Sequence, residues 1–326
     1  MTAFQHFENY STLPNVTETE VTDYFSDFHI VYHCVRLVQT IIGIIGNTMV
    51  IVIITKTKTM HTPANYILIS LAGSDLVSST FAPLLLILDQ LKVNGVPSVW
   101  IPLCHFSLIL AKYGSIVNLS SVALSAVDRF ISIKYAIIYR LKMTNNKMII
   151  IIVALWLAIL VKGIIEHIAG ASVRFDLRCL MEDVMDPTQF KIGTVYSFVI
   201  PSIITTSLYV YVVSVARKRF SKSAGRDKGD NKYQRTQKRM TRVMFTVFAA
   251  YYICYVPLLL GIMIPNHVAW KPLASDWLYM LYFFNSMVNP PIYYWKNVDF
   301  KKAFLKLLGS KNQVDVSTTG ASSTLF

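Results

Sequence analysis

Long apolar runs alternate with short polar stretches along the chain. A helix crosses the hydrocarbon core of a bilayer, about 30 Å thick, with about 20 residues because each residue adds about 1.5 Å. Seven runs have this length and lack the apolar–polar alternation of membrane β-strands. They cover residues 36–55, 66–88, 103–134, 148–165, 192–215, 241–264 and 275–295. The pattern predicts an all-α membrane protein, a seven-transmembrane helix bundle over residues 36–295.

The composition agrees with a membrane protein. The 326 residues are 54% hydrophobic and 15% charged, and the mean hydropathy is +0.47. The formal net charge of +13 comes mainly from Lys and Arg residues. Most of these residues lie in the polar stretches that follow the first, third, fifth and seventh runs. Such residues stay on the cytoplasmic side of a membrane and attract anionic lipid. We therefore expect these stretches in the cytoplasm, the amino terminus outside, and no nucleic-acid partner.

Residues 1–35 are expected to form an extracellular arm. They contain no Lys or Arg, and glycosylation sequons begin at Asn9 and Asn15. They also lack the basic start and short apolar core of a cleaved signal peptide, so the first span is expected to act as an uncleaved signal. We expect a multi-pass glycoprotein of the plasma membrane.

The four cysteines fit this topology. Cys104 opens the third run and Cys179 lies between the fourth and fifth runs, both on the oxidising side, where a disulfide can persist. We predict that these two residues pair. Cys34 and Cys254 are expected to be free thiols.

Polar residues inside the apolar runs indicate function, because a charged group in hydrocarbon costs at least about 2.5 to 3.5 kcal/mol. Asp75, in the middle of the second run, is the clearest example. At this point the chain resembles the class A, rhodopsin-like G protein-coupled receptors over about residues 30 to 308. The resemblance is carried by Gly46-Asn47, LAGSD ending at Asp75, Cys104, Asp128-Arg129-Phe130, Trp156, Cys179, Pro201 with Tyr209, Cys254-Tyr255-Val256-Pro257, and Asn289-Pro290-Pro291-Ile292-Tyr293.

Asp128 and Arg129 stand at the inner end of the third span, since Arg129 follows Cys104 by about 37 Å of helix. An ordinary ion pair at a helix end is the alternative reading. In the receptor family this Arg is held in the inactive state and meets the G protein in the active one. Phe130 replaces the usual Tyr, and Gln237 stands where some relatives carry a restraining acid. We therefore expect raised basal signalling, with Asp128 as the main restraint.

The resemblance implies an activation switch in spans five to seven, made of Tyr209, Tyr255, Pro257, Asn289, Pro290 and Tyr293. Two consecutive prolines remove helix hydrogen bonds and are expected to kink or loosen the seventh span. A static kink is the alternative reading. Tyr209 would be the water-bridged partner of Tyr293 in this switch.

Oxygen-bearing side chains at similar depth form a candidate sodium site. They are Asp75, Asn118, Asn285, Ser286 and Asn289. Such oxygens suit a small hard cation, and the family holds sodium there in the inactive state. A water-bonded polar network is the alternative. No cofactor and no other metal site is expected.

The outer half of the bundle contains the candidate ligand residues. They are Arg36, Asp89, Ala111, Lys112, Tyr255, Tyr279 and Tyr282. Ala111 stands where amine receptors carry an Asp, and Phe283 where opsins carry the retinal-binding Lys, so monoamines and retinal are disfavoured. Lys112 and Arg36 favour an anionic ligand, whereas the acidic amino-terminal arm favours a cationic one. The ligand therefore stays open.

The carboxyl-terminal part is predicted to lie on the inner membrane surface and then in the cytoplasm. Residues 296–309 are basic and amphipathic, as in a membrane-surface helix. Residues 310–326 are expected to be a disordered tail whose Ser and Thr residues attract receptor kinases and arrestin. The final Thr324-Leu325-Phe326 matches a PDZ ligand. Between spans five and six, the ends of residues 216–240 are expected to extend both helices.

These features predict a cell-surface receptor that senses an extracellular ligand and activates a heterotrimeric G protein. The sequence carries no nucleophile–base pair or phosphate loop, so an enzyme is not expected. The alternatives are a seven-span transporter or channel, and a constitutively active receptor that needs no ligand.

Overall fold

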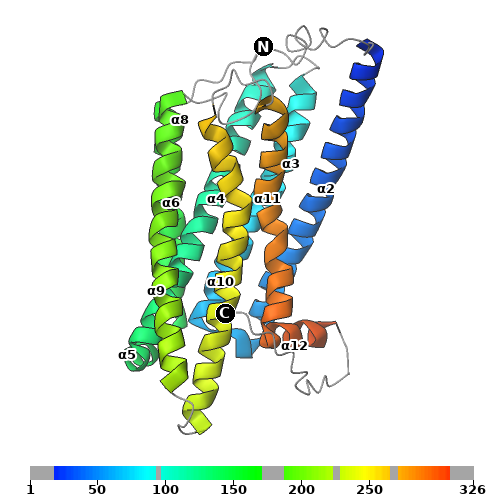
Figure 1. Cartoon of the computed structure of the whole chain (residues 1–326). Helices are drawn as coiled ribbons and strands as arrows, with labels where there is room; N and C mark the ends of the chain where they lie inside the picture. The colour runs from blue at the N-terminus through cyan, green and yellow to red at the C-terminus, as the bar shows by residue number, and fades with distance from the viewer. Residues whose placement is uncertain (1–17, 93–96, 171–186, 223–227, 265–270, 309–326) are drawn as a thin grey trace.

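The computed structural model describes residues 18–92, 97–170, 187–222, 228–264 and 271–308. Every regular element in these ranges is a helix, and the long helices run side by side as one bundle (Figure 1). In chain order they are α2 (Glu18–Lys56), the 3₁₀ turn η1 (Lys58–Met60), α3 (Pro63–Lys92), α4 (Pro97–Lys134), α5 (Ala136–Lys142), α6 (Asn145–Gly170), α8 (Pro187–Thr194), the π-helical segment η2 (Val195–Val199), α9 (Ile200–Lys222), α10 (Lys228–Met263), α11 (Lys271–Lys296) and α12 (Val298–Leu307).

Each predicted transmembrane run coincides with a long helix. The runs fall on α2, α3, α4, α6, the continuous α8–η2–α9 segment, α10 and α11. Five stretches of the described helices are long and apolar enough to cross a membrane: Val31–Lys56, Trp100–Lys134, Asn145–Ile165, Lys191–Val215 and Arg239–Met263. α3 and α11, which carry Asp75 and Asn289, are not among them.

Large aliphatic side chains cover the outside of the bundle. Ile150, Val161 and Ile203 are 66%, 56% and 61% exposed. A water-facing surface does not carry so much contiguous apolar area, whereas lipid accommodates it. The outward faces therefore agree with a multi-pass membrane protein.

α4 is the central helix of the bundle. It packs against α3, α6, α9 and α10, and most of its side chains from Tyr113 to Ala126 are buried. Two close approaches need glycine: a Cβ on Gly46 of α2 would come 2.9 Å from Cγ of Pro290 of α11, and a Cβ on Gly163 of α6 would overlap the ring of Tyr113. Small residues let helix backbones approach closely in a membrane.

The fifth span is irregular where the sequence places a proline. The π-helical turn η2 (Val195–Val199) ends two residues before Pro201. Proline has no N–H for the ordinary helix hydrogen bond, and a wider turn before it absorbs the mismatch.

Two elements at the α12 end of the bundle bear on the site. α12 follows α11 directly and turns away from the bundle axis (Figure 1); its position agrees with the predicted helix over 296–309. The Asn297 side chain caps it by accepting from the backbone N–H groups of Asp299 and Phe300. α5, between α4 and α6, is a short helix that the sequence pattern does not predict.

The helices also extend beyond the predicted runs. α9 continues to Lys222 and α10 begins at Lys228, so the ends of 216–240 are helical as expected. α2 begins at Glu18, inside the predicted amino-terminal arm.

Candidate functional site

Asp75 lies at the centre of the bundle and joins three helices. Its side chain is 1% exposed. The Asn118 amide of α4 donates to Asp75 Oδ1 at 2.9 Å, and the Asn289 amide of α11 donates to Oδ2 at 2.7 Å. Asn118 also reaches Ser74 Oγ at 3.4 Å. The carboxylate therefore receives a neutral donor on each oxygen from a different helix.

The polar network around Asp75 reaches α2. Asn47 Nδ2 donates to the carbonyls of Gly43 at 2.9 Å and of Ser286 at 2.7 Å, which ties α2 to α11. The buried amide oxygens without a hydrogen-bond partner within the described residues include the Oδ1 atoms of Asn47, Asn118, Asn285 and Asn289. Carboxylate and amide oxygens are ligands that a hard cation prefers.

The structure brings together much of the predicted sodium site. Asn118 and Asn289 bond directly to Asp75. Asn285 and Ser286 are buried one turn earlier on α11. Asn47, which the sequence analysis did not include, adds one more oxygen nearby through its tie to Ser286.

Asp128 and Arg129 form a buried ion pair at the end of α4. Each residue is 2% exposed. Arg129 Nε donates to Asp128 Oδ2 at 3.1 Å, and its Nη2 donates to the same oxygen. The second oxygen, Oδ1, accepts from the Tyr139 hydroxyl at 2.5 Å. Both carboxylate oxygens are thus occupied by groups on α4 and on α5.

Sequence reasoning missed Tyr139. It stands in a segment with no motif, and only the α5 helix turns its hydroxyl back toward α4. Phe130, in place of the usual Tyr, packs its ring 5.3 Å from the ring of Tyr211 on α9, with Lys134 Nζ 5.2 Å from the Phe130 ring. Phe130 therefore lies at the α4–α9 contact.

The tyrosines of the predicted switch, Tyr209 and Tyr293, are buried. The hydroxyls of Tyr209 of α9 and Ser125 of α4 form a hydrogen bond, with 2.6 Å between the oxygens. The Tyr293 hydroxyl has no bonding partner in the described part of the chain. Tyr209 also packs on Phe248 of α10 with ring centroids 4.6 Å apart. A water bridge from Tyr209 to Tyr293 stays a prediction.

The end of α10 that lies near α12 is joined to α12 by side-chain contacts. Arg239 makes an ion pair with Asp299, and Asn297 Nδ2 approaches Met240 Sδ at 3.9 Å. Gln237 lies in α10, but its side chain is outside the described residues. Pro257 and the Pro290–Pro291 pair lie inside continuous α10 and α11, and the predicted hinge in the seventh span stays a prediction.

Aromatic rings lie between Asp75 and the far end of the bundle. Tyr251 and Tyr255 stack with centroids 3.9 Å apart, and Tyr255 lies 4.5 Å from Tyr282. Tyr282 donates its hydroxyl proton to Ser115 of α4. These rings form a layer that joins α4, α10 and α11.

The predicted ligand residues lie on several helices. Tyr255 and Tyr282 belong to the aromatic layer, and Ala111 is buried on α4, with its carbonyl accepting from Ser115 at 3.0 Å. Arg36 of α2 is 5% exposed, and its guanidinium lies 4.2 Å from the Phe283 ring. Lys112 and Tyr279 are partly buried.

Several sequence predictions fall outside what the structure describes. These are the Asp89 side chain, Cys179, the sequons at Asn9 and Asn15, and the tail with Thr324, Leu325 and Phe326. Cys34 and Cys254 have free thiols, as predicted. Cys104 is buried near the start of α4, and its pairing with Cys179 stays a prediction.

Comparisons with known proteins agree with the seven-transmembrane fold. The model of the seven-transmembrane receptors of the rhodopsin family matches residues 46–293. The chain is 25% identical to melatonin receptor type 1B-B of Danio rerio, over 84% of this chain and 80% of that one. It is 27% identical to melatonin receptor type 1A of Mus musculus, with 83% and 78% covered. It is 25% identical to a Gq-coupled rhodopsin of Mizuhopecten yessoensis, over 90% of this chain and 61% of the relative.

Proposed function

Because the chain belongs to the rhodopsin family of seven-transmembrane receptors, it is a receptor that signals through a heterotrimeric G protein, and we propose that Arg129 is its G protein contact. In this proposal the α12 end of the bundle faces the cytoplasm and the protein resides in the plasma membrane. The observation that carries it is the buried Asp128–Arg129 pair at the end of α4. A transporter or channel is not supported, because the family consists of receptors.

In this proposal, hydrogen bonds and ion pairs at the α12 end of the bundle stabilise the resting state. Asp128 binds Arg129 through one oxygen and Tyr139 through the other. Charge-assisted hydrogen bonds of this kind are about twice as strong as neutral ones. Activation releases Arg129 from Asp128 and moves α10 away from α12, which breaks the Arg239–Asp299 pair. Tyr209, Tyr255, Pro257, Asn289, Pro290 and Tyr293 transmit the change along the bundle.

The test replaces Arg129 with alanine and measures nucleotide exchange on a purified G protein by receptor in membranes, normalised to surface expression. We expect Arg129→Ala to reduce exchange at least about tenfold, since it removes a charged contact worth about 1.4 kcal/mol or more. Arg242→Ala is the control, because Arg242 is an exposed arginine on α10. Exchange by Arg129→Ala equal to that of the wild type contradicts the proposal.

Asp75 is proposed to hold a sodium ion in the resting state, with Asn118, Asn285, Ser286 and Asn289 as further ligands. The buried carboxylate and the amide oxygens that lack hydrogen-bond partners among the described residues support this. A thermal-shift assay needs no agonist: NaCl should raise the Tm of the wild-type receptor above its value in N-methylglucamine chloride. Asp75→Asn should abolish the difference. An equal sodium response in both proteins excludes the site.

The ligand is proposed to bind beyond the aromatic layer, on the side away from Asp75. The candidate contacts are Arg36, Asp89, Ala111, Lys112, Tyr255, Tyr279 and Tyr282. The relatives named as melatonin receptors make melatonin the first compound to test. A screen against a promiscuous G protein readout, with Arg129→Ala as the inactive control, identifies the ligand. A wild-type receptor with full exchange in the absence of any added compound supports the ligand-independent alternative.

The remaining interactions are proposed from sequence alone. They are glycosylation at Asn9 and Asn15, the Cys104–Cys179 disulfide, phosphorylation of the tail by receptor kinases with arrestin binding, and a PDZ partner at Thr324, Leu325 and Phe326.

A further inference from the structure

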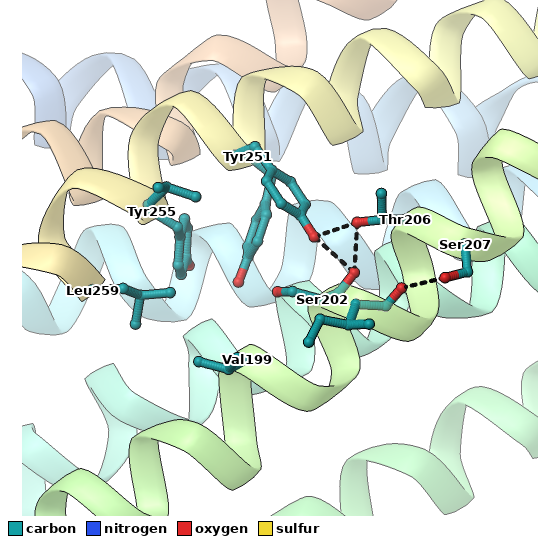
Figure 2. A pocket seen from close by; sticks show the side chains of 10 residues that line it. Val199, Ser202, Thr206, Ser207, Tyr251, Tyr255 and Leu259 are labelled. Atoms are coloured by element: carbon teal, nitrogen blue, oxygen red, sulfur yellow. Dashed lines mark hydrogen bonds between the residues drawn. The ribbon is translucent and has the colours of Figure 1, made fainter.

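A cavity of about 330 Å³ lies between α9 and α10, on the other side of Tyr251 and Tyr255 from α11 (Figure 2). Its walls are contributed by five residues of the η2–α9 segment and five of α10. They are Val199, Ser202, Ile203, Thr206, Ser207, Tyr251, Tyr252, Tyr255, Val256 and Leu259. None of these ten residues carries a charge.

The Tyr251 hydroxyl on the wall is a buried polar group. Tyr251 is 2% exposed, and its hydroxyl makes no hydrogen bond with any residue that the structure describes. Burying a hydroxyl without a hydrogen-bond partner is unfavourable. The cavity therefore offers a hydrogen bond to whatever enters it.

Three other hydroxyls on the wall, those of Tyr252, Thr206 and Ser207, already have partners. Tyr252 donates to the Ser202 carbonyl at 2.7 Å and bonds to Thr206 at 2.6 Å. Ser207 donates to the Ile203 carbonyl at 2.9 Å. Tyr251 is thus a buried hydroxyl on this wall that has no partner among the described residues and can bond to a ligand.

The cavity opens toward lipid at the depth of the bilayer centre. Ile203 and Val256 on its rim are 61% and 37% exposed. Tyr251 stands at the middle of the membrane-crossing stretch Arg239–Met263. A charged group at that depth is strongly disfavoured because hydrocarbon does not solvate it. An occupant must therefore be neutral and must arrive through the membrane.

We propose that this cavity binds a small neutral alcohol or phenol dissolved in the bilayer, whose oxygen bonds to the Tyr251 hydroxyl. The volume is at the low end of ligand pockets, about 300 to 1,000 Å³, so a whole phospholipid is too large. The stacked rings of Tyr251 and Tyr255 suit an aromatic ligand. Of the proposed ligand residues beyond the aromatic layer, Tyr255 also lines this cavity. The other proposed ligand residues do not line it.

The experiment uses the full-length receptor in phosphatidylcholine nanodiscs and a diazirine-bearing alkylphenol as the probe. We expect photolabelling to map to peptides of α9 and α10 that contain residues 199–207 and 251–259. Tyr251→Phe should weaken the apparent affinity about threefold to tenfold, the value of one net hydrogen bond. A matched alkylbenzene probe without the hydroxyl should bind the wild type and Tyr251→Phe equally.

Two tryptophan variants control for position. Ser207→Trp fills the cavity from an exposed position and should reduce labelling at least about tenfold. Ser214→Trp should leave labelling unchanged, because Ser214 is an exposed serine two turns along α9 with the same i−4 hydrogen bond and does not line the cavity. Labelling that is unaffected by Ser207→Trp overturns the site. If Tyr251→Phe does not change the apparent affinity, or changes it equally for both probes, the proposed hydrogen bond to the ligand is overturned. The occupant is then a lipid acyl chain.

Discussion

Asp75 and Asp128 are both buried acids of this receptor, and their partners differ. Asp75 accepts from neutral amides on two other helices, α4 and α11. Asp128 binds the adjacent Arg129 and the nearby Tyr139. Asp75 therefore joins distant parts of the bundle, whereas Asp128 holds a local pair.

These partners predict that Asp75 mainly determines the stability of the bundle and that Asp128 mainly determines signalling. Loss of the Asp75 carboxylate leaves buried donors on two helices, α4 and α11, without this acceptor, so the bundle itself is affected. Loss of a partner at Asp128 frees an arginine at a helix end without separating any helices. Four substitutions test this contrast, in order of expected effect.

Asp75→Leu should have the largest effect. It leaves the side-chain amides of Asn118 and Asn289 without their acceptor, at about 1 to 3 kcal/mol each. We expect a clear fall in Tm in a thermal-shift assay, and a smaller fall for Asp75→Asn, which retains one acceptor. Equal Tm values for Asp75→Leu and the wild type would falsify the three-helix role of Asp75.

Asp128→Ala should raise basal signalling while leaving Tm nearly unchanged. It removes the charge-assisted hydrogen bonds to Arg129, worth about 1.5 to 3 kcal/mol. This shifts the resting equilibrium roughly tenfold or more. Ligand-free nucleotide exchange measures it. A fall in Tm as large as that of Asp75→Leu would erase the contrast between the two acids.

Tyr139→Phe should have a similar effect of smaller size, since it removes one of the hydrogen bonds to Asp128. We expect a rise in basal exchange of about twofold to tenfold. Tyr135→Phe is the matched control, because Tyr135 is 45% exposed one turn earlier. The same response in both variants would show that the Asp128 contact does not matter.

Arg239→Ala should have the smallest effect. The pair with Asp299 is partly exposed, and such ion pairs contribute about 0 to 1 kcal/mol. A double-mutant cycle with Asp299→Ala, measured by basal exchange, gives the coupling between α10 and α12. A coupling well above 1 kcal/mol would make this pair, and not Asp128, the main restraint.

Much of the fold follows from one-dimensional patterns. Run length predicts the long helices, and the basic amphipathic stretch predicts the helix that the structure places at Val298–Leu307. Asp75, Asn118 and Asn289 could be grouped from their depth in the runs, and the structure joins them through hydrogen bonds. Each of these inferences depends on helical rise, which is the same in every helix.

Contacts between segments could not be predicted in the same way. Tyr139 reaches Asp128 only because α5 folds back against α4, and Arg239 meets Asp299 only because the chain turns from α11 into α12 beside the end of α10. No local pattern encodes either turn. The cavity beside Tyr251 is likewise a gap between two helices, and neither helix alone indicates it.

The sequence by itself determined the membrane class, the seven spans, the polar residues at their centre and the resemblance to the receptor family, because hydrophobic length and the cost of buried charge act locally along a chain. The tertiary structure decided which partner each buried polar group has. Those partners depend on how helices far apart in sequence pack against one another, as Gly46 against Pro290 illustrates.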